Sequence, residues 1–148
     1  MKPDIDRFLD VSAAYLMMEL APTLGSSYAQ SNVSILGMML AAVREEFGRA
    51  AARRIEENRE MRRLFGEAAP GVKDAALHHR LLDAAQSDDT DFTVSALEQS
   101  NAALRQTLID LHTHVEQLDT PEARRIEEAI WRELAASTER RRLMMGPF

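Results

Sequence analysis

The chain has 148 residues, no cysteine and a formal net charge of −6. This length is enough for one domain that buries a core without covalent cross-links. The lack of cysteine excludes disulfides, cysteine nucleophiles and thiolate metal sites. Acidic chains bind nucleic acids poorly, because that affinity depends on neutralising phosphates, so we expect no nucleic-acid partner.

Apolar residues at helical spacing predict a first helix from about Asp4 to Leu20, ended by Pro22 and Gly25. Acidic residues interrupt its start, so we expect neither a signal peptide nor export, and the protein is expected to be cytoplasmic. The predicted buried side of this helix consists of Ile5, Phe8, Leu9, Ser12, Leu16 and Leu20.

The spacing of Ser27 and Gln30 predicts a capping box at the start of a second helix. The stretch from Val33 to Val43 is apolar on nearly every side, which predicts that it lies at the centre of a bundle. It is too short to span a membrane, and we expect no membrane partner. Gly37 lies inside it, where a missing side chain lets another helix approach closely.

The segment from Arg44 to Phe65 has a narrow apolar stripe that includes Asn58, and its other positions are rich in arginine and glutamate. This pattern predicts a helix that packs at the rim of the bundle and exposes a charged side to water. The helix either continues from the preceding one through Gly48 or breaks there.

The longest regular pattern runs from Val94 to Leu118, after a short helix predicted over Val72–Ala85 and a polar loop over Ser87–Asp91. Steps of three and four residues place one stripe on one side of a helix, where a neighbouring helix covers it. Asn101 lies among the leucines of this stripe, either as a polar contact that fixes the register of two helices or as a group lining a pocket. The stripe consists of Val94, Leu97, Asn101, Leu104, Leu108, Leu111, Val115 and Leu118.

Thr120, Pro121 and Glu122 form an N-terminal helix signal for a last helix to about Arg142. The connection before it is so short that the last two helices are predicted to be antiparallel neighbours. The whole chain, 1–148, is therefore predicted to be one all-α domain, a bundle of four to six helices with short antiparallel connections and a tail over 143–148. The last helix is predicted to bury Ala123, Ile126, Ile130 and Leu134.

The four histidines do not form a chelating pair, because neighbours and next-neighbours on a helix point in different directions. Spacings that bring a carboxylate to a histidine on one helix supply at most two ligands each. No metal, cofactor or catalytic residue is therefore predicted, and an enzymatic activity is not favoured. These spacings are Asp74–His78, His79–Asp83 and Asp110–His114, and the remaining histidine is His112.

Two hypotheses about function remain. The first is a non-catalytic helical interaction or accessory protein, a homo-oligomer or the partner of another helical protein, with interface residues Trp131, Leu143, Met144, Met145 and Phe148. The second is a small-ligand-binding or enzymatic bundle with a pocket between helices, lined by Asn101, His112, His114, Met38 and Met39.

Three segments resemble a small uncharacterised all-helical family of GC-rich bacteria. They are Met18-Glu19-Leu20-Ala21-Pro22-Thr23-Leu24, Arg54-Ile55-Glu56-Glu57-Asn58 and Leu64-Phe65-Gly66-Glu67-Ala68. Genes of that family lie near those of aminoglycoside-phosphotransferase-like kinases and acyl-CoA dehydrogenases. The resemblance implies an accessory role in a bacterium and assigns no functional residue.

Overall fold

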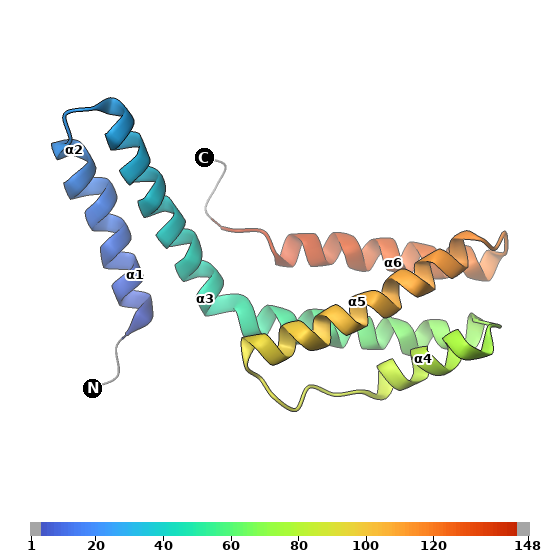
Figure 1. Cartoon of the computed structure of the whole chain (residues 1–148). Coiled ribbons are helices and arrows are strands. Elements are labelled where there is room, and N and C mark those ends of the chain that lie inside the picture. Colours follow the sequence, from blue (N-terminus) through green and yellow to red (C-terminus); the bar gives the residue numbers. More distant parts are fainter. Residues whose placement is uncertain (1–3, 145–148) are drawn as a thin grey trace. The chain divides into compact units, whose positions relative to one another are not determined.

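The computed structural model describes residues 4–144, and over this range the chain is all-α, with no strand (Figure 1). No helix in this range is both long and apolar enough to cross a membrane. The chain divides into two compact units, which the single-domain prediction did not distinguish. The N-terminal unit comprises residues 4–50 with 143–144, and the C-terminal unit comprises residues 51–142.

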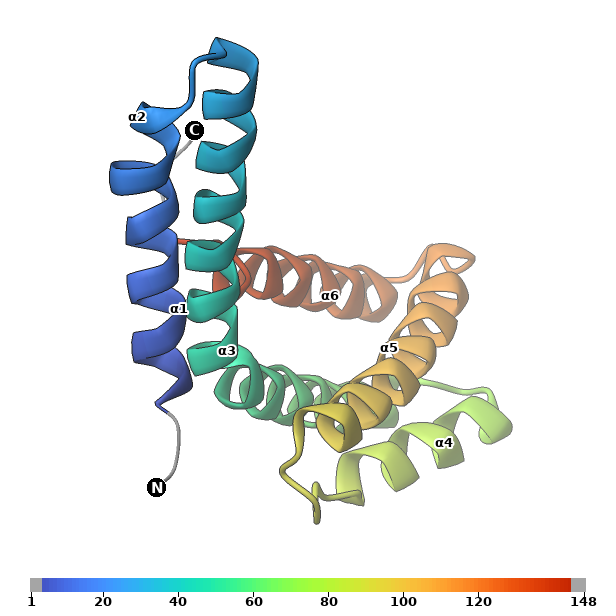
Figure 2. The ribbon, with the colours of Figure 1, turned by 60° about the vertical axis from the view of Figure 1, so that its left-hand side comes forward.

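The N-terminal unit is a helical hairpin. Helix α1 (Ile5–Ala14) begins at Asp4, whose carboxylate accepts a hydrogen bond from the Arg7 backbone N–H. A π-helical turn (Tyr15–Leu20) and the short α2 (Ala21–Thr23) continue it. The chain then turns back into α3 (Ser27–Ala68), whose first half lies beside α1 in both ribbon views (Figures 1 and 2).

Small residues form the contact between the two arms of the hairpin. A Cβ atom on Gly37 would lie 2.4 Å from Cγ of Met17 and 3.0 Å from the carbonyl oxygen of Ala13, so only glycine permits this approach. The close helix contact predicted at Gly37 is confirmed. Ala13 and Ala21 are likewise buried, at 3% and 4% exposure.

Three predictions for this unit are wrong. The capping box does not form, because the Gln30 side chain donates to the Leu24 carbonyl instead. Ile5 and Phe8 do not belong to the buried side of α1, since they are 45% and 69% exposed. The stretch from Val33 to Val43 is not central, because it touches a helix on one side only and exposes Ile35, Leu36, Met39 and Val43.

The C-terminal unit contains the rest of α3, a 3₁₀ turn (Ala69–Gly71), α4 (Ala75–Gln86), α5 (Val94–Glu116) and α6 (Pro121–Arg140). Side chains of Asp74, Thr93 and Thr120 cap α4, α5 and α6 by accepting backbone N–H groups. The predicted cap at Thr120 is confirmed, and α5 and α6 lie side by side and antiparallel (Figures 1 and 2).

The hydrophobic core lies in the C-terminal unit. The stripe predicted on α5 is buried at its six inner positions, from Leu97 to Val115, whereas its ends Val94 and Leu118 are 45% and 41% exposed. The predicted rim position of Arg44–Phe65 is wrong for its second half, because Met61 and Phe65 are among the most buried side chains. The core consists of residues from all four helices and the 3₁₀ turn, with Phe65, Leu81, Leu111 and Ile130 fully buried.

Candidate functional site

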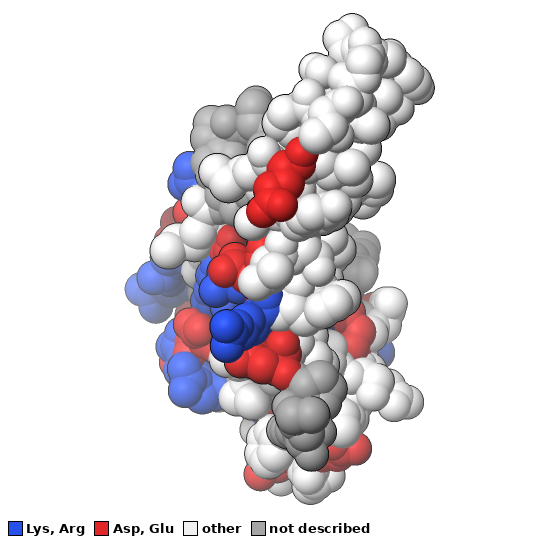
Figure 3. Space-filling view, turned by 90° about the vertical axis from the view of Figure 1, so that its left-hand side faces the viewer, with Lys and Arg blue, Asp and Glu red and all other residues white. Residues whose placement is uncertain are grey.

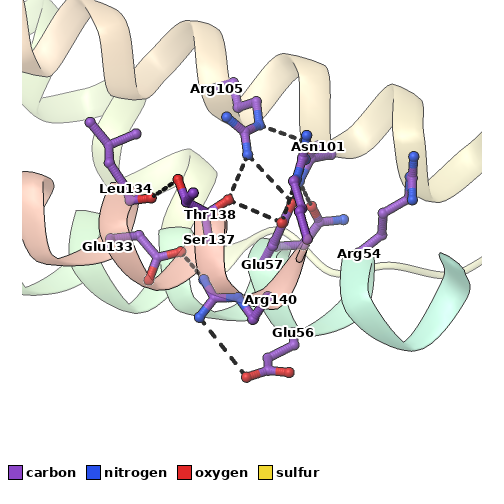
Figure 4. Close-up of polar contacts among 12 residues, drawn as sticks. Arg54, Glu56, Glu57, Asn101, Arg105, Glu133, Leu134, Ser137, Thr138 and Arg140 are labelled. Carbon is purple, nitrogen blue, oxygen red and sulfur yellow. Dashed lines mark hydrogen bonds and ion pairs between the residues drawn. The ribbon is translucent and has the colours of Figure 1, made fainter. Parts of the chain in front are cut away.

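A cluster of polar side chains lies inside the C-terminal unit, where α3, α5 and α6 meet. Figure 4 shows Glu57 of α3, Asn101 of α5 and Ser137 of α6 close to one another. Glu57, Asn58 and Asn101 are no more than 1% exposed. Buried polar groups are costly unless they form hydrogen bonds. The contacts of these side chains therefore decide whether the cluster is a reactive site or a structural one.

Glu57 is the centre of the cluster, and four side chains surround its carboxylate. Arg141 binds it in a bidentate manner, with Nε 2.7 Å from Oε1 and Nη2 2.6 Å from Oε2. The Ser137 hydroxyl donates to Oε1 at 3.0 Å, and Asn101 Nδ2 donates to Oε2 at 3.2 Å. Arg105 adds a contact of 3.4 Å to Oε2. Glu57 thus connects α3 to both α5 and α6.

These partners decide the charge of Glu57. Burial alone raises the pKa of this carboxyl, but the hydrogen bond and charge of Arg141, the Ser137 hydroxyl and the charge of Arg105 lower it from 4.5 to about 2. Glu57 is therefore ionised at neutral pH. A carboxylate with so low a pKa is a poor general base, because it scarcely binds a proton.

Asn58 and Asn101 form the polar contact between helices that the α5 stripe suggested. Asn101 Nδ2 lies 2.9 Å from Asn58 Oδ1, and Arg105 Nε donates to Asn101 Oδ1 at 2.9 Å. Asn58 Nδ2 is shared between the Asp89 carboxylate and the Leu97 carbonyl. Every polar atom of Asn101 is thus occupied by neighbouring side chains, which favours a register-fixing role.

A second buried ion pair fixes the loop between α4 and α5. Arg62 of α3 binds the Asp89 carboxylate through two nitrogens, at 2.9 and 2.8 Å. This hydrogen bonding to Arg62 outweighs burial, and with help from Ser100 and Asn58 it lowers the Asp89 pKa from 3.8 to about 2. Arg62 Nη2 also donates to Ser100 at 3.1 Å. The cluster therefore holds four elements in register rather than presenting a reactive group.

The other distinctive feature is apolar surface on the hairpin. Steps of three and four residues place one exposed stripe along α1, and a second runs along the first half of α3. At about 100° per residue, the residues of both stripes lie roughly 80–180° around their helices from the α1–α3 contact at Ala13 and Gly37, so neither stripe faces the other arm of the hairpin. We call them the hairpin stripes. The first consists of Ile5, Phe8 and Val11 on α1 with Tyr15 and Met18 on the π-helical turn that follows it, and the second consists of Tyr28, Ile35, Leu36, Met39, Val43 and Phe47 on α3.

Charge is nearly absent from this part of the surface. Between Val11 and Val43 the only charged residue is Glu19. The upper end of the space-filling view, where α2 and the first residues of α3 lie, is accordingly almost all white (Figure 3). Apolar surface of this extent marks an interaction site on a protein.

The predicted pocket residues fall in separate places. Asn101 belongs to the buried cluster, and the ring nitrogen Nε2 of His112 and that of His114 are each buried without a hydrogen-bond partner within residues 4–144. Met38 and Met39 belong to the N-terminal unit, and Met39 is 58% exposed. The pocket between helices stays a prediction.

The predicted interface residues also differ in position. Trp131 is 56% exposed on α6, and its ring packs edge-to-face on His112 at 5.3 Å. Leu143 and Met144 are exposed, and the Met144 backbone N–H donates to the Glu45 carboxylate at 2.8 and 3.0 Å. Met145 and Phe148 lie outside the described residues.

Sequence reasoning missed the residues at the centre of the cluster. Glu57 and Asp89 looked like ordinary charges on a helix side and in a polar loop, although Glu57 precedes the stripe residue Asn58. It also missed the spacing of four between His112 and Glu116. The available signal was the placement of a polar residue on an apolar stripe, since such a residue needs partners.

A comparison of the chain with protein-family models, with curated proteins and with solved structures gave no match.

Proposed function

We propose that the protein is a non-catalytic helical interaction protein that self-associates through the hairpin stripes. The observation that carries this proposal is the distribution of side chains in the N-terminal unit. Its buried residues are small, such as Ala13, Ala21 and Gly37, whereas none of the large apolar residues between positions 4 and 50 is fully buried and eleven of them are exposed. A helix that is apolar on two sides needs cover on both, and one arm of the hairpin covers only one.

The partner we propose is a second copy of the chain. The eleven side chains of the stripes are 45–77% exposed. If a large side chain offers roughly 200 Å², they present roughly 1,000 Å² per copy. A stable interface buries about 800 Å² on each partner, so the stripes are large enough for a dimer. In a symmetric dimer the α1 stripe of each copy packs on the α3 stripe of the other.

The charge pattern favours self-association. Two identical surfaces bring identical charges together, which costs free energy wherever a charge lies at the centre. Most of the hairpin stripes avoid this cost, because between Val11 and Val43 only Glu19 is charged. The resemblance to a bacterial helical family adds an accessory role to this proposal.

The test is the molar mass in solution, measured by light scattering after size-exclusion chromatography over a range of protein concentrations. We expect a dimer for the unaltered chain and a monomer for Met39→Glu, because a charge at the centre of an apolar interface loses its hydration. Ile109→Glu is the matched control, since Ile109 is 56% exposed on α5 in the other unit and should leave the dimer intact.

A monomer at all concentrations for the unaltered chain contradicts the proposal. A dimer that Ile109→Glu dissociates and Met39→Glu does not would place the interface on the C-terminal unit instead. Far-UV circular dichroism shows whether each variant keeps its helices. Both substituted residues are more than half exposed, so the folded chain accommodates the new side chain without repacking.

A further inference from the structure

The end of α5 and the start of α6 bring together one imidazole and two carboxylates. His112 and Glu116 are one helical turn apart on α5, and His112 Nε2 lies 3.5 Å from Glu116 Oε1. Glu127 of α6 faces them from the neighbouring helix, and one ligand atom of each of these three residues lies within 4.8 Å of the other two. The three side chains converge although they come from two helices.

The imidazole of this group lacks a good partner. His112 Nε2 is buried and has no hydrogen bond within residues 4–144, since 3.5 Å to Glu116 is longer than an N–H···O bond. A buried nitrogen without a partner is rare in folded proteins and indicates an ion or a water. His112 is also held in place, because the Trp131 ring packs on it edge-to-face at 5.3 Å.

The carboxylates are equally short of partners. Among the described residues Glu127 forms no hydrogen bond and no ion pair, and the side chain that Glu116 contacts is the His112 imidazole. The arginines nearby are used elsewhere: Arg124 binds Asp119, and Arg125 contacts Glu122. Two carboxylates this close repel each other unless a cation lies between them.

One imidazole nitrogen with two carboxylate oxygens is a ligand set for a first-row transition metal, with Zn²⁺ as the most common case. Ca²⁺ and Mg²⁺ prefer oxygen ligands alone. Glu116 is exposed, with a side chain 54% accessible, so the metal can enter from solvent and a water can complete its coordination.

We propose that His112, Glu116 and Glu127 form a Zn²⁺ site that ties α5 to α6 next to their connecting turn. The metal satisfies the buried nitrogen of His112 and cancels the repulsion between the two carboxylates. Because both helices belong to the C-terminal unit, the site strengthens the helix pair independently of self-association.

The test is titration of Zn²⁺ into chelator-treated protein, with stoichiometry from elemental analysis after dialysis. We expect one Zn²⁺ per chain and a raised thermal unfolding temperature, because the metal binds the folded state alone. Glu127→Gln should weaken binding by at least about tenfold, since one ligand charge is lost. Glu128→Gln is the matched control, as Glu128 is the exposed neighbour outside the group, and it should bind Zn²⁺ like the unaltered chain.

A second readout uses Trp131, the only tryptophan of the chain. Co²⁺ bound to His112 lies close to the indole and should quench its fluorescence along the same binding curve, whereas Mg²⁺ should not. Absence of stoichiometric Zn²⁺ overturns the proposal. Equal binding by Glu127→Gln and Glu128→Gln overturns it too. Both substitutions keep the size of the side chain, so the fold tolerates them.

Discussion

The two units of the molecule differ in where they place their large apolar side chains, which are buried in one unit and exposed in the other. In the C-terminal unit Phe65, Leu111 and Ile130 are fully buried, and the exposed positions of its helices are mostly charged or polar. In the hairpin the buried residues are alanine and glycine, while Met18 and Tyr28 are more than three-quarters exposed. The C-terminal unit thus has the core of a domain that folds on its own contacts, whereas the hairpin lacks one.

This comparison also separates two uses of polar residues. The C-terminal unit has buried charges that are fully paired, such as Glu57 with Arg141 and Asp89 with Arg62. Such pairs add directional contacts between helices that apolar packing alone does not specify. The hairpin stripes have no comparable pairs, so their packing partner is selected by shape and apolar area.

The largest effect is expected from Glu57→Gln. It leaves the guanidinium groups of Arg141 and Arg105 without their carboxylate, and breaking a buried pair costs about 3 kcal/mol of the free energy of unfolding. Urea unfolding measures this loss. Glu56→Gln is the control, because Glu56 is half exposed and 3.9 Å from Arg140, and we expect it to cost less than about 1 kcal/mol. Equal losses would refute the central role of Glu57.

Acid should lower the free energy of unfolding of the C-terminal unit, because two of its carboxylates have low pKa values. The pKa of Asp89 is about 2 in the folded chain against 3.8 ordinarily, and that of Glu57 is about 2 against 4.5. Their contribution is complete above the ordinary values and is lost as the pH falls toward about 2. Asp89 alone accounts for about 2 kcal/mol of this change.

The measurement is the free energy of unfolding between pH 5 and about pH 2 for the unaltered chain and for Asp89→Asn. The variant should be less stable at pH 5 and should lose less stability on acidification. Asp83→Asn on the exposed side of α4 is the control and should follow the unaltered chain. Parallel curves for all three proteins would show that the Arg62–Asp89 pair contributes little.

The smallest effects come from two glycines of α3 that test the hairpin contact. In Gly37→Ala the new Cβ meets Met17 and the Ala13 carbonyl, so overpacking outweighs the gain of about 1 kcal/mol in helix propensity and the hairpin loses about 1 kcal/mol. In Gly48→Ala nothing lies within 4 Å of the new Cβ atom, so this variant keeps the gain in helix propensity. Thermal unfolding followed by circular dichroism should therefore shift in opposite directions. A stabilised Gly37→Ala variant would contradict this prediction, because it would show that the facing arm of the hairpin moves to make room for the new Cβ atom.

The spacing of apolar residues predicted where the helices lie in the chain better than it predicted which sides of those helices are buried. The stripe from Leu97 to Val115 is regular in both spacing and residue type, and it is buried as predicted. The stretch from Val33 to Val43 is just as apolar, yet four of its eleven residues are exposed. A pattern states that a side of a helix avoids water but does not state which chain covers it, so the sequence could not distinguish a core from an interface.

The candidate sites were predictable only in part, because they join residues far apart in the chain. Asn101 was identified on its stripe, but its partner Glu57 lies 44 positions earlier among similar glutamates. His112 and Glu116 share one helix, whereas Glu127 reaches them only because the α5–α6 turn brings two helices together. Such combinations depend on the register between helices, which local spacing does not encode.

The placement of the aromatic side chains gives each unit its own chromophore. Trp131 lies in the C-terminal unit, whereas both tyrosines of the chain, Tyr15 and Tyr28, lie in the hairpin. Selective excitation of tryptophan therefore follows the loss of one unit, and tyrosine absorbance follows the loss of the other. Two curves that do not coincide during denaturation would mean that this chain unfolds in two steps, and only the earlier step should depend on protein concentration.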